Sequence, residues 1–201
     1  MRIENGIVVG TIGTKYSSRN PLARYLVQGF DHAIGTLAAQ SDPQAILEIG
    51  SGEGHVTEIL LKETRARIHA TELSEAVMNE TRNQLTDPRV SWELAKLEDY
   101  HPAGHFDLVV CCEVLEHLPD PSAGLKSLRS MDADHFLLSV PNEPIWRMLN
   151  FLRGSYFRDF GNSPGHVQHW STRQFIKFVS TEFTVLEVRT PLPWTALLCK
   201  K

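Results

Sequence analysis

Between residues 45 and 140, short apolar runs alternate with segments of helical periodicity, and no other feature of the sequence constrains the fold as strongly. Apolar residues recur at helical spacing in 55–63, 74–85 and 121–130. The apolar or β-branched runs that predict strands are AILEIG (45–50), ARIHAT (66–71), RVSWEL (89–94), FDLVVCC (106–112) and HFLLSV (135–140). This rhythm is typical of an α/β fold whose parallel sheet carries helices on both faces. The order of the strands does not follow from it.

The segments that flank the alternation are predicted to complete a single domain of 201 residues. After Pro141 the alternation stops, and prolines, glycines and clustered aromatic residues indicate an insertion over the sheet. The expected parts are an N-terminal helical cap at 1–43, the core at 44–140, the insertion at 141–172, and a C-terminal helix and hairpin at 173–201, with strands near 183–189 and 194–199. We expect the helix PLARYLVQGFDHAIGTLAAQ to pack across the mouth of the site.

The charge balance and the cysteines narrow the class of protein. With 20 basic and 24 acidic residues, the net charge of -4 gives no general attraction for nucleic acid or for an anionic membrane. The cysteines Cys111, Cys112 and Cys199 form no C-x-x-C pair, which favours reduced thiols. No run approaches the ~20 apolar residues of a membrane span. We therefore expect a cytoplasmic protein without a membrane span or a nucleic-acid partner; its oligomeric state does not follow.

A glycine-rich turn and an acid mark a nucleoside site. The stretch ILEIGSGEGH (46–55) places three glycines directly after the first predicted strand: Gly50, Gly52 and Gly54. A dinucleotide fingerprint requires G-x-G-x-x-G, and His55 stands where its third glycine would be, which disfavours a nicotinamide-dependent dehydrogenase. Glu72 ends the next predicted strand, where a carboxylate can accept hydrogen bonds from both ribose hydroxyls. A solvated glutamate at a strand end is the alternative interpretation.

The spacing G-x-G-x-G, with Glu48 two residues before it, resembles motif I of the class I S-adenosylmethionine-dependent methyltransferases. FDLVVCCEVLEHLPDP (106–121) resembles their motif IV, most closely the ExxEH form of the ubiquinone-biosynthesis O-methyltransferases. The resemblance covers about residues 44–140. It implies a Rossmann-like, seven-stranded, mostly parallel sheet with an antiparallel C-terminal strand, S-adenosylmethionine as cofactor, and methyl transfer to an oxygen, or a nitrogen, of a small-molecule acceptor.

The same resemblance assigns cofactor residues. Arg24, in an Asn-Pro-x-x-Arg segment, is expected over the methionine carboxylate, because a guanidinium fork matches a carboxylate. Many relatives have an Asp near the adenine where this chain has Ala95, so Glu98 or Asp99 is expected to substitute. The full set implied for the cofactor is Arg24, Glu48, Gly50, Ser51, Gly52, Gly54, Glu72, Leu73, Leu97, Cys112 and Glu113.

The ExxEH segment has three open interpretations. Glu113, Glu116 and His117 share one face if the segment is helical. They fix the loop through hydrogen bonds, or His117, with His166, is the general base for the acceptor. Alternatively, a divalent metal is held by Glu113, Glu116, His117 and His166, because GHVQHWSTRQF resembles a segment of metal-binding small-RNA 2'-O-methyltransferases.

The chemical class of the methyl acceptor is inferred from the residues of the insertion. Residues 144–170 contain Trp146, Phe151, Tyr156, Phe157, Phe160 and Trp170, interspersed with Arg147, Arg153 and Arg158. These aromatic side chains either wall a pocket for a planar acceptor or hold the insertion together as a hydrophobic cluster. An RNA acceptor is the second candidate, but it requires a basic stripe beside the aromatics, and the acidic net charge favours a small molecule. A module that binds the cofactor without catalysis is a third.

Overall fold

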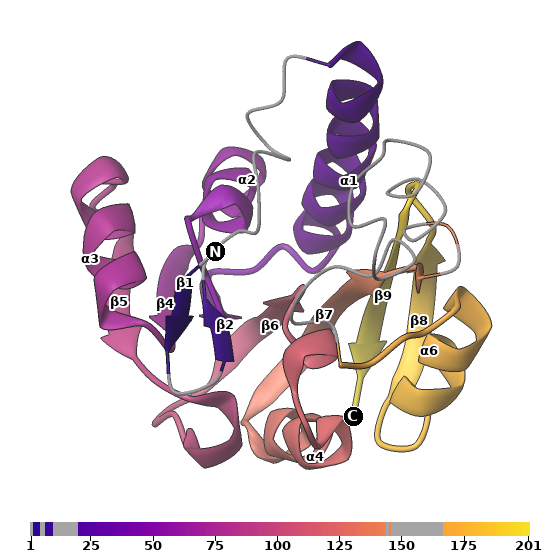
Figure 1. The fold of residues 1–201 in the computed structure, drawn as a ribbon. Helices are drawn as coiled ribbons and strands as arrows, with labels where there is room; N and C mark the ends of the chain where they lie inside the picture. Colours follow the sequence, from indigo (N-terminus) through magenta and orange to yellow (C-terminus); the bar gives the residue numbers. More distant parts are fainter. Residues whose placement is uncertain (1, 5–6, 10–19, 144, 146–166) are drawn as a thin grey trace.

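The computed structural model describes residues 2–4, 7–9, 20–143, 145 and 167–201 of the chain, and its centre is a seven-stranded sheet (Figure 1). The strands of this sheet are β3 (Ala45–Ile49), β4 (Arg67–Glu72), β5 (Val90–Leu94), β6 (Phe106–Cys112), β7 (Ala133–Pro141), β8 (Thr184–Arg189) and β9 (Trp194–Lys200). Their order is β5-β4-β3-β6-β7-β9-β8. Only β9 runs against the others, because a short connection from β8 permits only antiparallel pairing. The predicted strands, and the antiparallel C-terminal strand, are confirmed.

Helices cover both faces of the sheet, as expected for strands with apolar residues on both sides. The helical segments are α1 (Pro21–Gln40), α2 (His55–Glu63), α3 (Glu75–Gln84), α4 (Pro121–Ser130), α6 (Thr172–Val179), and the 3-10 turns η1 (Leu97–Asp99) and η2 (Leu115–His117). One core lies between the sheet and α1 and α2, and the other lies between the sheet and α4 and α6. Cys112 belongs to the first core and Cys111 to the second, so the two thiols point to opposite faces of the sheet.

The helix boundaries follow from local capping. The side chain of Asn20 accepts hydrogen bonds from the first turn of α1, and Asp120 does the same for α4. Ser171 and Gln174 form a reciprocal capping box at the start of α6. These polar residues stand directly before apolar periodic segments, which explains why the predicted boundaries are close to the observed ones.

The N-terminal region differs from the helical cap expected over 1–43. The helix occupies 21–40, whereas β1 (Arg2–Glu4) and β2 (Ile7–Val9) pair as antiparallel strands. The sequence between these two strands is Asn-Gly, the pair that two-residue hairpin turns favour, and it was overlooked in the prediction.

The site lies at the carboxyl ends of the parallel strands, which we call the carboxyl edge of the sheet. The carboxyl ends of β3, β4, β5, β6 and β7 lie together because these strands are parallel. Helix α1 runs the opposite way; its 20 residues span ~30 Å, against ~16 Å for the five residues of β3. The amino half of α1 therefore extends beyond the carboxyl edge (Figure 1).

The ends of the predicted insertion also meet at this edge. Asn142, directly after β7, forms a parallel bridge with Trp170, and the N–H of Glu143 donates to the carbonyl oxygen of Trp170. The insertion therefore leaves and rejoins the fold beside the end of β7. Most of its residues, 146–166, lie outside the described part of the chain.

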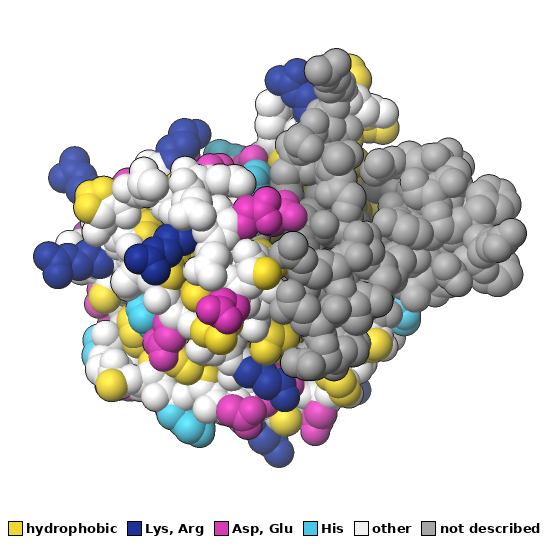
Figure 2. All heavy atoms as spheres, turned by 60° about the vertical axis from the view of Figure 1, so that its left-hand side comes forward, with side chains coloured by type: hydrophobic (Ala, Val, Ile, Leu, Met, Phe, Trp, Pro, Cys, Tyr) yellow, Lys and Arg dark blue, Asp and Glu magenta, His cyan; other side chains and the backbone are white. Residues whose placement is uncertain are grey.

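Two surface properties bear on partners. No helix among the described residues is long and apolar enough to cross a membrane. On the face that Figure 2 displays, basic and acidic side chains are interspersed among polar and apolar ones, and the coloured part of this face carries no continuous basic stripe.

Candidate functional site

The glycine turn after β3 is closely packed on two sides and open in the middle. Gly50, Gly52 and Gly54 have φ of +73°, +53° and +81°, in the left-handed region that glycine occupies without strain. A Cβ at Gly50 would lie 2.5 Å from Val114, and one at Gly54 would lie 2.8 Å from Thr81. At Gly52 a Cβ would meet no atom of the described residues within 4 Å. The turn thus leaves space for a ligand at its central glycine.

The Glu72 carboxylate is fixed beside this turn. It is 6% exposed; one oxygen accepts a hydrogen bond from the N–H of Gly52 at 2.9 Å, and the other accepts from the N–H of Ser74 at 3.0 Å. A carboxylate has about four acceptor sites, so each oxygen keeps acceptor capacity for a hydroxyl. This geometry matches the predicted ribose contact, because the carboxylate is oriented before any ligand binds.

Two further polar side chains lie at the turn. The hydroxyl of Ser51 is buried and has no hydrogen-bond partner among the described residues, a situation that is rare in proteins and fits a ligand contact. Glu48 is 2% exposed and accepts a hydrogen bond from the hydroxyl of Thr57 in α2 at 2.7 Å. Burial raises the pKa of Glu48 to about 7, although the Thr57 bond opposes this shift and the charge of Glu72 adds to it.

The end of β6 has an unusual backbone. Glu113 has φ of +60°, which is uncommon for a residue with a Cβ and marks a sharp exit from the strand. Its N–H still donates to the carbonyl oxygen of Ser139, and its carboxylate accepts from the indole N–H of Trp194 at 2.9 Å. Trp194 belongs to β9, so the carboxylate reaches across the end of β7. Burial raises the pKa of the preceding Cys112 thiol, which is therefore neutral.

The ExxEH segment is not a continuous helix, so the condition for one shared helical face is not met. Only Leu115–His117 forms a 3-10 turn, and the positive φ of Glu113 separates that residue from the turn. Glu116 is 1% exposed, and His117 is half-buried. The carbonyl oxygen of Glu116 accepts hydrogen bonds from the N–H groups of Val167 and Gln168. This holds the returning end of the insertion against the segment.

A carboxylate and an imidazole that the sequence interpretation missed lie at the end of β7. Nδ1 of His169 is 3.6 Å from Oε2 of Glu143. The side chain of Glu143 is 3% exposed, and that of His169 is 38% exposed. Glu143 lies shortly after a predicted strand, so the reasoning that selected Glu72 at a strand end could also have pointed to it.

The other predicted residues lie around this edge or outside the described part. Arg24 is exposed on the amino half of α1, Leu73 is exposed after β4, and Leu97 is buried at the start of η1. Asp31, midway along α1, bonds Nε2 of His55 at the start of α2, at 2.7 Å. Outside the described residues lie His166, Trp146, Phe151, Tyr156, Phe157, Phe160, Arg147, Arg153 and Arg158.

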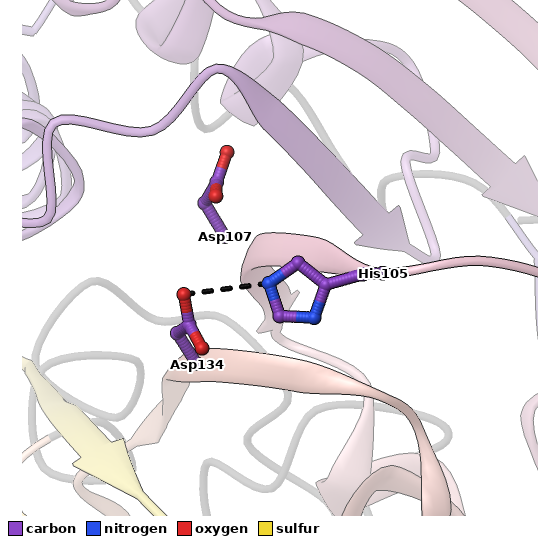
Figure 3. Close-up of side chains that lie close together, drawn as sticks. All are labelled: His105, Asp107 and Asp134. Atoms are coloured by element: carbon purple, nitrogen blue, oxygen red, sulfur yellow. Dashed lines mark hydrogen bonds and ion pairs between the residues drawn. The ribbon is translucent and has the colours of Figure 1, made fainter.

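Among the described residues, one His/Asp group has ligand atoms close enough for a metal, and it is at the opposite end of the sheet. His105, Asp107 and Asp134 lie within 4.8 Å of one another at the amino ends of β6 and β7 (Figure 3). His105 pairs with Asp134 and also with Asp132, while Asp107 accepts from the N–H groups of residues 44 and 45 at 2.8 Å. The hydrogen bonds and ion pairs of this group connect the amino ends of neighbouring strands. The group contains none of the predicted metal ligands.

Comparison with known proteins identifies the family. A family model described as a methyltransferase domain matches residues 22–182. The chain belongs to this family. The predicted class I methyltransferase fold is confirmed.

Relatives of the domain differ in what they methylate. The ubiquinone biosynthesis O-methyltransferase of Thiobacillus denitrificans is 37% identical over 83 residues, which are 39% of this chain and 35% of that one. This chain thus spans about a third of that relative's length. The N-methyltransferase NodS from Bradyrhizobium japonicum, in complex with S-adenosyl-L-homocysteine, has a TM-score of 0.69 at 18% identity, covering 92% of this chain and 90% of its own. The methyltransferase domain of bacterial CtHen1 has a TM-score of 0.68 at 20% identity, covering 88% and 100%. At these identities the structural likeness shows the fold.

Proposed function

We propose that this methyltransferase domain moves the methyl group of S-adenosylmethionine to a hydroxyl oxygen of a small planar acceptor. The observation that carries the proposal is the pre-oriented Glu72 carboxylate beside the open glycine turn, with further carboxylates and imidazoles continuing along the same sheet edge. The first feature suits a nucleoside, and the second suits an acceptor that loses a proton.

The cofactor extends along the edge in the order of the strands. Glu72 holds the ribose, Leu73 lies against the adenine, and the backbone near Leu97 contacts the base. The methionine part lies over the glycine turn, at Gly50, Ser51, Gly52 and Gly54, and reaches the end of β6 at Cys112 and Glu113. Arg24, in the amino half of α1 beyond the carboxyl edge, pairs with the methionine carboxylate. Glu48 stabilises the turn by accepting a hydrogen bond from the hydroxyl of Thr57 in α2.

The reaction is an in-line displacement. The bond from the acceptor oxygen to the methyl carbon forms while the carbon–sulfur bond breaks, and the sulfonium leaves as the neutral thioether of S-adenosylhomocysteine. Holding oxygen, methyl and sulfur in line contributes ~7–11 kcal/mol. The hydroxyl proton passes to an imidazole, for which the sequence predicts His117 or His166.

A small acceptor is favoured over RNA. The net charge is -4, and basic side chains on the displayed face are interspersed with acidic ones (Figure 2), whereas RNA requires a continuous basic stripe. Oxygen is favoured over nitrogen because the curated relative is named as an O-methyltransferase. The predicted metal set of Glu113, Glu116, His117 and His166 combines oxygen and nitrogen donors that suit Mg²⁺, Mn²⁺ or Zn²⁺. An ion bound there would polarise the acceptor oxygen.

Methyl transfer from labelled S-adenosylmethionine to a panel of phenols, catechols and alkylamines tests the proposal. We expect label on a phenol or catechol oxygen, and activity that disappears with a chelator and returns with a divalent ion if the metal set is occupied. Label on an amine alone would contradict the oxygen assignment. Cofactor binding without transfer to any member of the panel would favour the binding-module interpretation.

A further inference from the structure

The imidazole of His169 and the carboxylate of Glu143 lie together at the end of β7, on the acceptor side of the site. We propose that they form a dyad in which His169, rather than His117, accepts the proton of the acceptor, and Glu143 positions the imidazole. The proposal rests on the proposed methyl transfer and names its base.

The sheet order puts this pair in the right place. The glycine turn and the ribose carboxylate belong to β3 and β4, and β6 and then β7 follow on one side. Neighbouring strands are ~4.8 Å apart, so the end of β7 lies roughly 10 Å from the end of β3. A methionine part that extends from the turn to the end of β6 leaves the next position, over β6 and β7, for the acceptor.

The backbone around His169 is fixed on both sides. The N–H groups of Val167 and Gln168 both donate to the carbonyl oxygen of Glu116, and the side-chain amide of Gln168 donates to the backbone carbonyl oxygen of Leu118 at 3.2 Å. The carbonyl oxygen of Trp170 accepts from the N–H of Glu143 at 3.0 Å. These bonds cross between β6 and β7 and hold the imidazole above the carboxyl edge.

The two side chains have the properties that a base and its positioning group require. Glu143 is buried at 3% exposure, which confines its carboxylate, and Nδ1 of His169 is the ring atom that faces it. The distance of 3.6 Å exceeds a hydrogen bond, and such catalytic contacts shorten when the ligand binds. With Nδ1–H donating to Glu143, Nε2 is the acceptor, and 38% exposure leaves the ring accessible.

In the reaction, the acceptor O–H proton moves to Nε2 of His169 as the oxygen–methyl bond forms. The positive charge lost at sulfur then appears on the imidazolium, where the Glu143 carboxylate stabilises it. The imidazolium releases its proton to solvent after the products leave. Atoms and charge balance without a further reactant.

Long-range ¹H–¹⁵N spectra of the histidine side chains, recorded with S-adenosylhomocysteine bound and at alkaline pH where imidazoles are neutral, test the dyad. His169→Gln identifies the His169 signals by their loss. We expect the Nδ1–H tautomer in the unaltered protein, and the Nε2–H tautomer, which free histidine prefers, in Glu143→Met, whose side chain has similar length but no acceptor oxygen. His101→Gln, at an exposed position, is the matched control.

An Nε2–H tautomer in the unaltered protein would overturn the dyad, as would a tautomer that does not change in Glu143→Met. If that variant does not fold, the tautomer of the unaltered protein decides alone. Failure of the proposed function has a different signature, namely no binding of S-adenosylhomocysteine by calorimetry.

Discussion

The carboxyl edge and the amino edge, where the parallel strands begin, both contain acidic side chains, but these side chains differ in burial. At the amino edge, His105 pairs with Asp132 and Asp134, and these aspartates are 75% and 60% exposed. At the carboxyl edge, Glu48 and Glu72 are nearly inaccessible. Exposed pairs contribute little to stability, whereas burying a carboxylate is costly unless it is well bonded.

The difference indicates which edge is functional. Amino-edge groups have partners within the fold, and Asp107 ties the backbone before β3 to β6. Carboxyl-edge groups surround open space at Gly52 and a buried hydroxyl at Ser51 without a described partner. Buried acids that raise the free energy of the unliganded fold are typical of a binding site. Substitutions at both edges test this difference.

Replacing Glu72 should have the largest effect. Glu72→Ala removes the carboxylate that we propose contacts the ribose and that accepts from the N–H of Gly52, and charge-assisted hydrogen bonds contribute ~1.5–3 kcal/mol each. We expect affinity for S-adenosylhomocysteine to fall by at least ~10²-fold in calorimetry. Glu75→Ala, an exposed acid in the first turn of α3, is the control and should bind normally. Equal affinities would remove Glu72 from the site.

His169→Gln should affect turnover rather than binding. Loss of a general base typically lowers the rate ~10²–10⁴-fold. We expect at least ~10²-fold slower methyl transfer to the phenol or catechol that the panel identifies, with cofactor affinity unchanged. His117→Gln separates the two candidate bases. The larger loss in that variant would return the role to His117.

Glu48→Gln should change how stability depends on pH. Burial raises the pKa of Glu48 from 4.5 to about 7, so between these values the folded state holds a proton that the unfolded state has lost. Stability therefore falls as pH rises through this window. The side-chain amide oxygen of the variant can still accept the hydrogen bond of the Thr57 hydroxyl, but the side chain carries no charge at any pH. We expect the variant to be more stable than the unaltered protein by ~1–3 kcal/mol above about pH 8 in urea unfolding, and equally stable near pH 4. A constant difference at all pH values would contradict the raised pKa.

His105→Gln should have the smallest effect. The side chain is half exposed, and its ion pairs are screened by solvent. Thermal unfolding and cofactor affinity should match those of the unaltered protein within error. A lost cofactor site in this variant would show that the two edges are energetically coupled, contrary to the comparison.

The sequence predicted those features that depend on neighbouring residues. Alternation gave the strands and helices, and the spacing of Gly50, Gly52 and Gly54 with Glu72 indicated the nucleoside site. The strand order depends on packing between distant elements, so it became known only from the fold. The sequence left open whether the segment of Glu113, Glu116 and His117 is helical; it is not, because Glu113 adopts a positive φ and bonds Trp194, 81 residues away. Glu143 and His169 are brought together by the closure of the insertion, which no local pattern encodes.

We propose that the carboxyl edge binds S-adenosylmethionine through the glycine turn and Glu72. Calorimetric titration of the unaltered protein with S-adenosylhomocysteine, and separately with NAD, tests it most directly. We predict saturable, one-site binding of S-adenosylhomocysteine that Glu72→Ala weakens, and no heat of binding for NAD. Binding of NAD without binding of S-adenosylhomocysteine would contradict the account.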